Sequence, residues 1–233
     1  MSRTRLAAVL ATTITCISCS RWDLPVEIPF QATWDNQAIA CEGTTPALTD
    51  LRFYVTNPRL VDPAGREHDV RFATEFEWEN DAVALIDLET GRGACAGGSP
   101  ETYDRVIGVA RAGDYRGLRF TVGVPFRLNH ADLRTASPPL DRNDMHSQTV
   151  SGYKFLRAGV AAESGGFDIQ ISSEGCNGSV GYVTGCERPN RIEVFLPDFE
   201  PGDGVSVNLD RLRDVVNGLP AGKQNVFVTR KQP

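Results

Sequence analysis

The sequence contains few residues that could bind a metal ion or catalyse a reaction. Only three of its 233 residues are histidine, and two are methionine. It lacks the Gly-x-Ser-x-Gly sequence of α/β-hydrolases and the His-Glu-x-x-His sequence of zinc proteases. Its arginines are scattered and its net charge is −6, so no basic face predicts nucleic-acid binding. We therefore expect neither an enzyme nor a nucleic-acid-binding protein.

The sequence also lacks an apolar run long enough to remain in a bilayer. Residues 6–17 are apolar and follow Arg3 and Arg5, which is the arrangement of an export signal. We therefore expect residues 1–20 to be a signal peptide and the protein to be periplasmic or a membrane-anchored lipoprotein. Cys19 is the candidate for lipidation, although no Leu-Ala-Gly-like lipobox precedes it. Ordinary cleavage nearby and a retained segment are the alternatives, and only a lipid would attach the protein to a membrane.

Four cysteines follow this leader, and none belongs to a Cys-x-x-Cys pair. They are Cys41, Cys95, Cys176 and Cys186. An even number of cysteines in an exported chain favours disulfides, and three connectivities are possible. Proximity suggests that Cys176 pairs with Cys186, which leaves Cys41 for Cys95. A four-cysteine zinc site is disfavoured because the sequence has no zinc knuckle.

Short segments of alternating apolar and polar residues predict an all-β fold. With 22 glycines and regular turns, they indicate one antiparallel β-sandwich or barrel-like domain over residues 24–233, with long loops and disulfide staples. Residues 82–88 fit either a strand or a short helix, and residues 205–216 begin as a strand and end with helical spacing. The strand-like segments are 26–33, 51–60, 106–110, 118–124, 153–156, 165–172 and 191–196.

A long polar loop separates the strand-like segments 118–124 and 153–156. Loops of this length are often functional. This loop carries His130, His146 and Met145, the only methionine besides the initiator. With the cysteines in disulfides, soft-metal ligands must come from these residues or from His68, which lies in a charged turn. Two imidazoles and a thioether suit copper but would also accept zinc, and each histidine could instead have only a hydrogen-bonding role.

Several longer segments resemble the MbnP-like family of bacterial copper-binding proteins. They are 50–57 (DLRFYVTN), 84–89 (ALIDLE), 115–126 (YRGLRFTVGVPF), 128–130 (LNH), 152–157 (GYKFLR) and 189–191 (PNR). This resemblance implies an exported, β-rich copper protein encoded beside a dihaem peroxidase related to MauG and MbnH. In studied relatives that partner oxidises a tryptophan to kynurenine, which supports copper binding. The family histidine corresponds to His130, and the family cysteines to the four above.

The central loop departs from the family pattern. Relatives usually have tryptophans between the methionine and the Gly-Tyr-Lys sequence, whereas residues 145–151 here are MHSQTVS. The chain has only Trp22, Trp34 and Trp78. Either His146 replaces the lost ligand, or another tryptophan is modified, or the scaffold has lost its copper site. We expect copper acquisition, storage or delivery, and the alternative is a metal-free interaction module.

Overall fold

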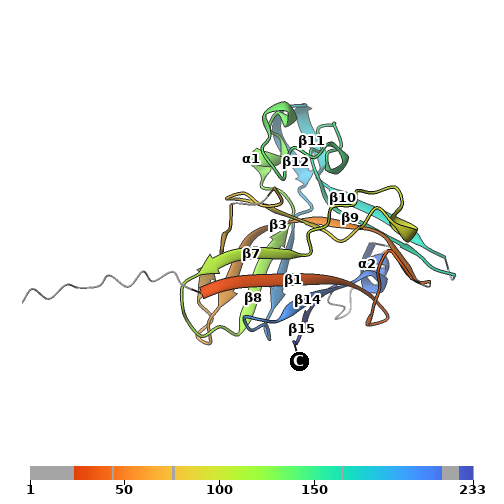
Figure 1. The fold of residues 1–233 in the computed structure, drawn as a ribbon. Coiled ribbons are helices and arrows are strands. Elements are labelled where there is room, and N and C mark those ends of the chain that lie inside the picture. Colours follow the sequence, from red (N-terminus) through yellow and green to blue (C-terminus); the bar gives the residue numbers. More distant parts are fainter. Residues whose placement is uncertain (1–23, 44, 75–76, 164, 217–225, 233) are drawn as a thin grey trace, which may run out of the picture.

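A computed structural model describes residues 24–43, 45–74, 77–163, 165–216 and 226–232, and nearly half of them form strands (Figure 1). The expected all-β fold is confirmed. The expected leader, Cys19 and Trp22 lie outside the described residues. Within the described part of the chain, no helix is both long enough and apolar enough to cross a membrane.

Two main sheets and a separate hairpin make up the fold (Figure 1). The strands pair antiparallel except β1 and β14, which pair parallel. The first sheet has the order β15 (Phe227–Arg230), β14 (Gly204–Asn208), β1 (Leu24–Trp34), β7 (Arg105–Ala110), β5 (Arg71–Phe72), with β2 (Gln37–Ala38) beside β1. The second has the order β10 (Phe167–Ser172), β9 (Lys154–Ala161), β3 (Ala47–Val61), β8 (Gly117–Val122), β13 (Ile192–Leu196), with β4 (Glu67–Asp69) and β6 (Ala84–Asp87) beside β3. The hairpin is β11 (Glu174–Ser179) and β12 (Tyr182–Arg188).

In the part of the chain that the structure describes, two short α-helices and three 3-10 turns connect these strands. They are α1 (Phe126–Asn129), α2 (Leu209–Val216), η1 (Gly93–Cys95), η2 (Leu133–Thr135) and η3 (Asn143–Met145). The segment 205–216 thus divides into β14 and α2, which buries Leu209 and Leu212 at helical spacing. Residues 84–87 form a strand, which settles the ambiguity of the segment 82–88.

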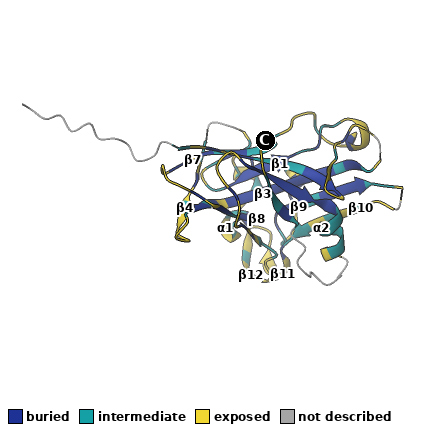
Figure 2. Ribbon diagram, turned by 90° about the horizontal axis from the view of Figure 1, so that it is seen from below, coloured by how far each residue is buried: buried dark blue, intermediate teal, exposed yellow. Residues whose placement is uncertain are grey.

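The two main sheets pack face to face around an apolar core. Alternate residues of each strand point to opposite faces, so one face of each sheet contributes to this core. The rings of Phe30 and Phe53, from different sheets, meet edge-on with centroids 5.2 Å apart. Figure 2 shows that burial concentrates in these central strands, whereas the β11–β12 hairpin is mostly exposed.

Strand β3 is buried on both faces. Leu51, Phe53 and Val55 face the sandwich core, whereas Arg52 and Tyr54 face the opposite side. A second, smaller apolar cluster covers that opposite side. Part of this cluster comes from the long central loop, so the second sheet lies between the sandwich core and the loop.

Both disulfides have the pairing that proximity suggests. Cys41 bonds to Cys95 within the sandwich core, where the two residues are 2% and 1% exposed. Cys176 bonds to Cys186 across β11 and β12, where the two residues are direct strand partners. The two disulfides therefore differ in their access to solvent.

Candidate metal centre

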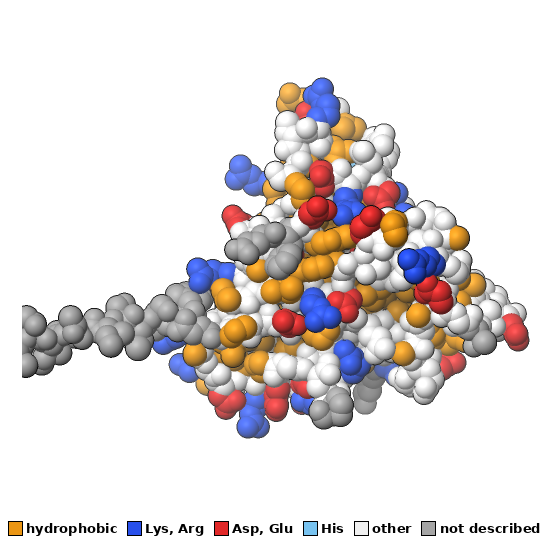
Figure 3. Space-filling view, viewed as in Figure 1, with side chains coloured by type: hydrophobic (Ala, Val, Ile, Leu, Met, Phe, Trp, Pro, Cys, Tyr) orange, Lys and Arg blue, Asp and Glu red, His pale blue; other side chains and the backbone are white. Residues whose placement is uncertain are grey.

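The central loop and the β11–β12 hairpin stand above the two main sheets (Figure 1). We call α1, residues 130–152 and this hairpin the cap. Figure 3 shows apolar side chains gathered beneath the cap on one face, with charged side chains scattered around them. The cap contains the two histidines and the methionine that the sequence singles out.

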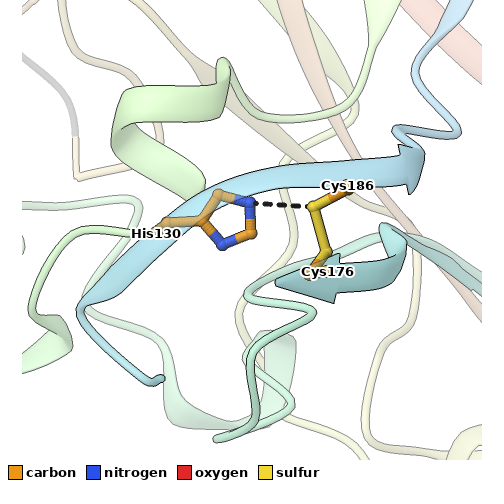
Figure 4. A group of neighbouring side chains, drawn as sticks. All are labelled: His130, Cys176 and Cys186. Atoms are coloured by element: carbon orange, nitrogen blue, oxygen red, sulfur yellow. Dashed lines mark hydrogen bonds between the residues drawn. A yellow bond between two sulfur atoms is a disulfide. The ribbon is translucent and has the colours of Figure 1, made fainter. Parts of the chain in front are cut away.

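His130 follows α1 directly and is 8% exposed. Its Nε2 lies 3.1 Å from Asn129 Nδ2 and 3.5 Å from Cys186 Sγ (Figure 4). An amide nitrogen only donates, so the contact with Asn129 is a hydrogen bond in the tautomer that carries the ring proton on Nδ1 and leaves Nε2 to accept. Burial lowers the pKa of His130, which favours this neutral form. In this tautomer Nε2 accepts from Asn129 and lies beside the hairpin disulfide.

Asn129 connects His130 to the far end of the loop. Its Oδ1 accepts a hydrogen bond of 2.7 Å from the backbone N–H of Tyr153, which fixes the orientation of the amide. Its Nδ2 also donates to Ser151 O at 3.1 Å. Gly152 has a φ of +74° and lies against the backbone of Asn129, where an added Cβ would be 2.2 Å from the carbonyl oxygen of Asn129. Glycine is therefore required here both by the backbone conformation and by the space available.

His146 follows η3 and is 6% exposed. Its Nδ1 accepts a 2.8 Å hydrogen bond from the backbone N–H of Gln148, so the neutral ring carries its proton on Nε2. Its ring meets Tyr153 edge-on at 4.7 Å. Burial lowers the pKa of His146, and a charge on His130 or Lys154 lowers it further. The two loop histidines therefore interact electrostatically, and both favour the neutral form.

Met145 is fully buried in the smaller apolar cluster. Tyr54 and Tyr153 belong to the same cluster, and their rings meet edge-on at 5.6 Å. The hydroxyl of Tyr153 donates to the carbonyl of Leu140, and burial raises its pKa to about 12. Met145 thus packs as a core side chain that holds the loop on the second sheet.

A buried arginine anchors the same part of the loop. Arg52 is 6% exposed and donates from Nε and Nη2 to both oxygens of Asp50, at 2.9 and 2.8 Å. Its Nη1 donates to Asp144 in η3, and Lys154 Nζ donates to the Asp144 carbonyl at 2.8 Å. Burial disfavours the charge of Arg52, but its bonds to Asp50 outweigh this effect and raise its pKa. Arg52 therefore ties η3, and with it the backbone leading to His146, to β3.

A buried carboxyl lies near Arg52 at the end of β6. Asp87 is 1% exposed, and burial raises its pKa to about 7, although the charge of Arg52 acts in the opposite direction. The nearby carboxylate of Glu89 adds to the increase. Asp87 therefore takes up a proton at mildly acidic pH, next to the arginine that anchors the loop.

The two tryptophans within the described residues lie in different environments. Trp78 is half-buried beside the smaller apolar cluster, stacked on Tyr103 with ring centroids 5.8 Å apart. The guanidinium of Arg142, from the central loop, lies 3.9 Å from the Trp78 ring centroid. Trp34 is 8% exposed and stacks on Phe167 in the sandwich. Trp78 is therefore the more accessible of the two and contacts the cap.

Comparison with known proteins decides the family. A family model described as MbnP matches residues 23–225. The chain belongs to the MbnP family. The solved structure of MbnP from Methylosinus trichosporium is similar to it, with a TM-score of 0.66 and 24% sequence identity over 90% of this chain and 81% of that chain. At this identity the likeness supports the fold alone. No curated protein matches the chain significantly.

The cap of this MbnP family member contains nitrogen and sulfur atoms that could bind a soft or borderline metal ion, but they are not equally available. Nε2 of His130 accepts from Asn129 Nδ2 at 3.1 Å, so a metal ion bound there would replace this hydrogen bond. His146 would have to release Gln148, or exchange its tautomer, before it could bind. The sulfurs of Cys176 and Cys186 lie near His130, with the three ligand atoms within 4.8 Å of one another. Because these sulfurs form a disulfide, they offer no thiolate.

Residues missed by sequence reasoning hold the cap together. Asn129 and Tyr153 connect the two histidines, and Arg52 anchors η3. The Leu-Asn-His sequence includes Asn129, and Gly152 precedes Tyr153, so both positions lie within segments that carry the family resemblance. The contact between His130 and the hairpin disulfide had no sequence signal, because it joins positions 56 residues apart.

Proposed function

We propose that this member of the MbnP family binds copper in the cap, with His130 as its principal ligand and His146 as the second. The observation that carries the proposal is the buried imidazole of His130, whose Nε2 lies 3.1 Å from the amide nitrogen of Asn129 and accepts from it in the tautomer that can bind a metal ion. Neutral imidazoles suit Cu(I) and Cu(II), and the pKa values of both histidines are lowered by burial. Binding at His146 would replace its hydrogen bond from Gln148. Met145 would support the loop and would serve at most as a weak further donor.

In this proposal, the protein is exported and acts in copper acquisition, storage or delivery rather than as an enzyme. A dihaem peroxidase of the kind found beside family members is the proposed partner. If that partner oxidises a tryptophan of this chain, Trp78 is the best candidate within the described residues. It is half-buried and contacts Arg142 of the cap, whereas Trp34 is enclosed in the sandwich.

The experiment that tests this proposal is copper stoichiometry by elemental analysis. The oxidised, exported protein is loaded with copper and dialysed against a weak chelator. We expect about one copper per wild-type chain, almost none in His130→Ala and a reduced amount in His146→Ala. His68→Ala is the matched control, because His68 lies in β4 with its Nε2 3.2 Å from Asp62 Oδ2. Equal retention by wild type and His130→Ala would contradict the proposal.

A metal-free interaction module is the second candidate. Two observations favour it: Met145 is fully buried, and Nδ1 of His146 already accepts a hydrogen bond. This candidate predicts that the wild-type protein retains no copper, even after co-expression with a dihaem peroxidase. Copper that is acquired only after co-expression would instead support a site completed by oxidation of a side chain.

A further inference from the structure

His130 faces two latent sulfur ligands. Its Nε2 is 3.5 Å from Cys186 Sγ, and Nε2 and the two sulfurs all lie within 4.8 Å of one another (Figure 4). Two thiolates and one imidazole form a donor set that selects Cu(I) or zinc. The disulfide bond is the feature that keeps these sulfurs from binding a metal.

The hairpin would keep the two cysteines together after the disulfide opens. Cys176 and Cys186 are direct partners in the β11–β12 ladder, which continues on both sides of them. Arg188 and Glu174 form a further pair in this ladder, with Nε 2.9 Å from a carboxylate oxygen. The backbone ladder and this ion pair do not depend on the S–S bond. The thiols would therefore remain beside His130.

The two disulfides within the described residues are not equally open to a reductant. Cys176 and Cys186 are half-buried, in a hairpin whose other residues are mostly exposed. Cys41 and Cys95 are 2% and 1% exposed inside the sandwich core. Thiol–disulfide exchange requires the attacking thiolate to reach a sulfur atom, so a dithiol should open the hairpin disulfide first.

We propose that reduction of the Cys176–Cys186 disulfide by a dithiol converts the surroundings of His130 into a two-sulfur, one-nitrogen site for Cu(I). The dithiol supplies two electrons and two protons and becomes a disulfide, while the S–S bond of the protein breaks to give two thiols. Binding of Cu(I) then displaces both thiol protons, and His130 contributes the lone pair of Nε2. This reduced site shares His130 with the proposed copper site but does not require His146.

The test compares Cu(I) affinity in the oxidised and reduced forms of the full exported chain. The protein is treated with dithiothreitol, which is removed without oxygen by gel filtration, and alkylation with mass spectrometry identifies the opened disulfide. Cu(I) is then titrated against a chromophoric chelator. We expect at least about tenfold tighter binding after reduction, with a near-ultraviolet sulfur-to-copper absorption band. Reoxidation should restore the original affinity.

Variants separate this proposal from the proposed function. The double variant Cys176→Ser, Cys186→Ser should lose the gain on reduction, whatever copper the oxidised protein retains. His130→Ala should weaken the reduced site, whereas His68→Ala should not. Equal affinities before and after reduction of the hairpin would overturn the proposal, as would simultaneous opening of Cys41–Cys95. An oxidised protein that binds no copper would count against the proposed function alone.

Discussion

The sandwich and the cap are stabilised by different kinds of interaction. The sandwich core consists of apolar side chains from many strands, and its contacts are distributed over two sheets. The cap rests on a smaller apolar cluster and on a few buried polar groups: Asn129 at one end of the loop and Arg52 beneath η3. Apolar packing is non-directional, whereas hydrogen bonds and ion pairs fix positions. The cap can therefore hold ligands in place but is more easily disrupted by one substitution.

The largest expected effect is in the sandwich. Phe53 is fully buried and meets Phe30 edge-on, so Phe53→Ala should lower the free energy of unfolding by about 4 kcal/mol. Urea unfolding at equilibrium measures this change. Val180→Ala, at a hairpin position that is 57% exposed, is the control and should have little effect. If the Phe53→Ala protein remains folded, its copper content should match that of the wild type, because Phe53 points into the sandwich core, on the face of β3 opposite the loop.

Arg52→Met tests the anchor of the cap. It would leave Asp50 buried without its main partner and should lower the free energy of unfolding by about 3 kcal/mol. Because η3 would also be released, copper should bind about tenfold more weakly. The control is Arg134→Met, whose side chain is 88% exposed and pairs with Asp132 at the surface. A loss of stability without any loss of copper affinity would show that the anchor does not position the site.

Gly152→Ala tests how closely the loop packs on α1. Both the positive φ and the contact with Asn129 O oppose a side chain here, so we expect a loss of about 2 kcal/mol in the free energy of unfolding. Gly181→Ala is a matched control, because its φ of +82° is similar and no atom lies within 4 Å of the added Cβ. If the two variants lost the same free energy of unfolding, the loss would come from the backbone conformation alone and not from close packing against Asn129.

The smallest expected effect concerns pH. The pKa of Asp87 is raised from its usual 3.8 to about 7 in the folded protein. Between these two pH values, Asp87 is protonated in the folded protein but ionised in the unfolded chain. This contribution to stability is complete below about pH 4 and is lost as the pH rises through about 7. Relative to Asp87→Asn, the wild type should lose about 1–2 kcal/mol between about pH 5.5 and pH 7, because each pH unit below the raised pKa changes the free energy of unfolding by about 1.4 kcal/mol. Urea unfolding at several pH values measures this difference. The control is Asp114→Asn, at an exposed position. If the free energy of unfolding changed with pH in the same way for wild type and Asp87→Asn, the raised pKa would be contradicted.

Much of the sandwich could be predicted from the sequence, because one-sided burial leaves an alternating pattern. The burial of β3 on both faces could not be predicted, because Arg52 and Tyr54 resemble the solvent-facing residues of an ordinary strand. Proximity along the chain favoured the disulfide pairing that the structure shows, although the sequence left three connectivities open. The parallel pairing of β1 with β14 had no local signal, because it joins segments about 175 residues apart.

Less of the cap could be predicted. Rarity singled out His130, His146 and Met145, but rarity carries no information about burial or tautomer. The structure places Met145 in an apolar cluster and gives the two histidines opposite proton positions. Asn129 remained unnoticed because its role depends on Tyr153, 24 residues away. Whether these residues bind copper remains a prediction.

The most direct test of the account is nitrogen NMR of the three imidazoles in ¹⁵N-histidine-labelled, oxidised protein, before and after addition of Cu(I). Before copper is added, we expect the His130 proton on Nδ1 and the His146 proton on Nε2. Copper should then shift Nε2 of His130 and perturb His146, while His68 remains unchanged beside Asp62. A protonated Nε2 on His130, or an unshifted His130 signal at full copper loading, would contradict the central claim that His130 is the principal ligand.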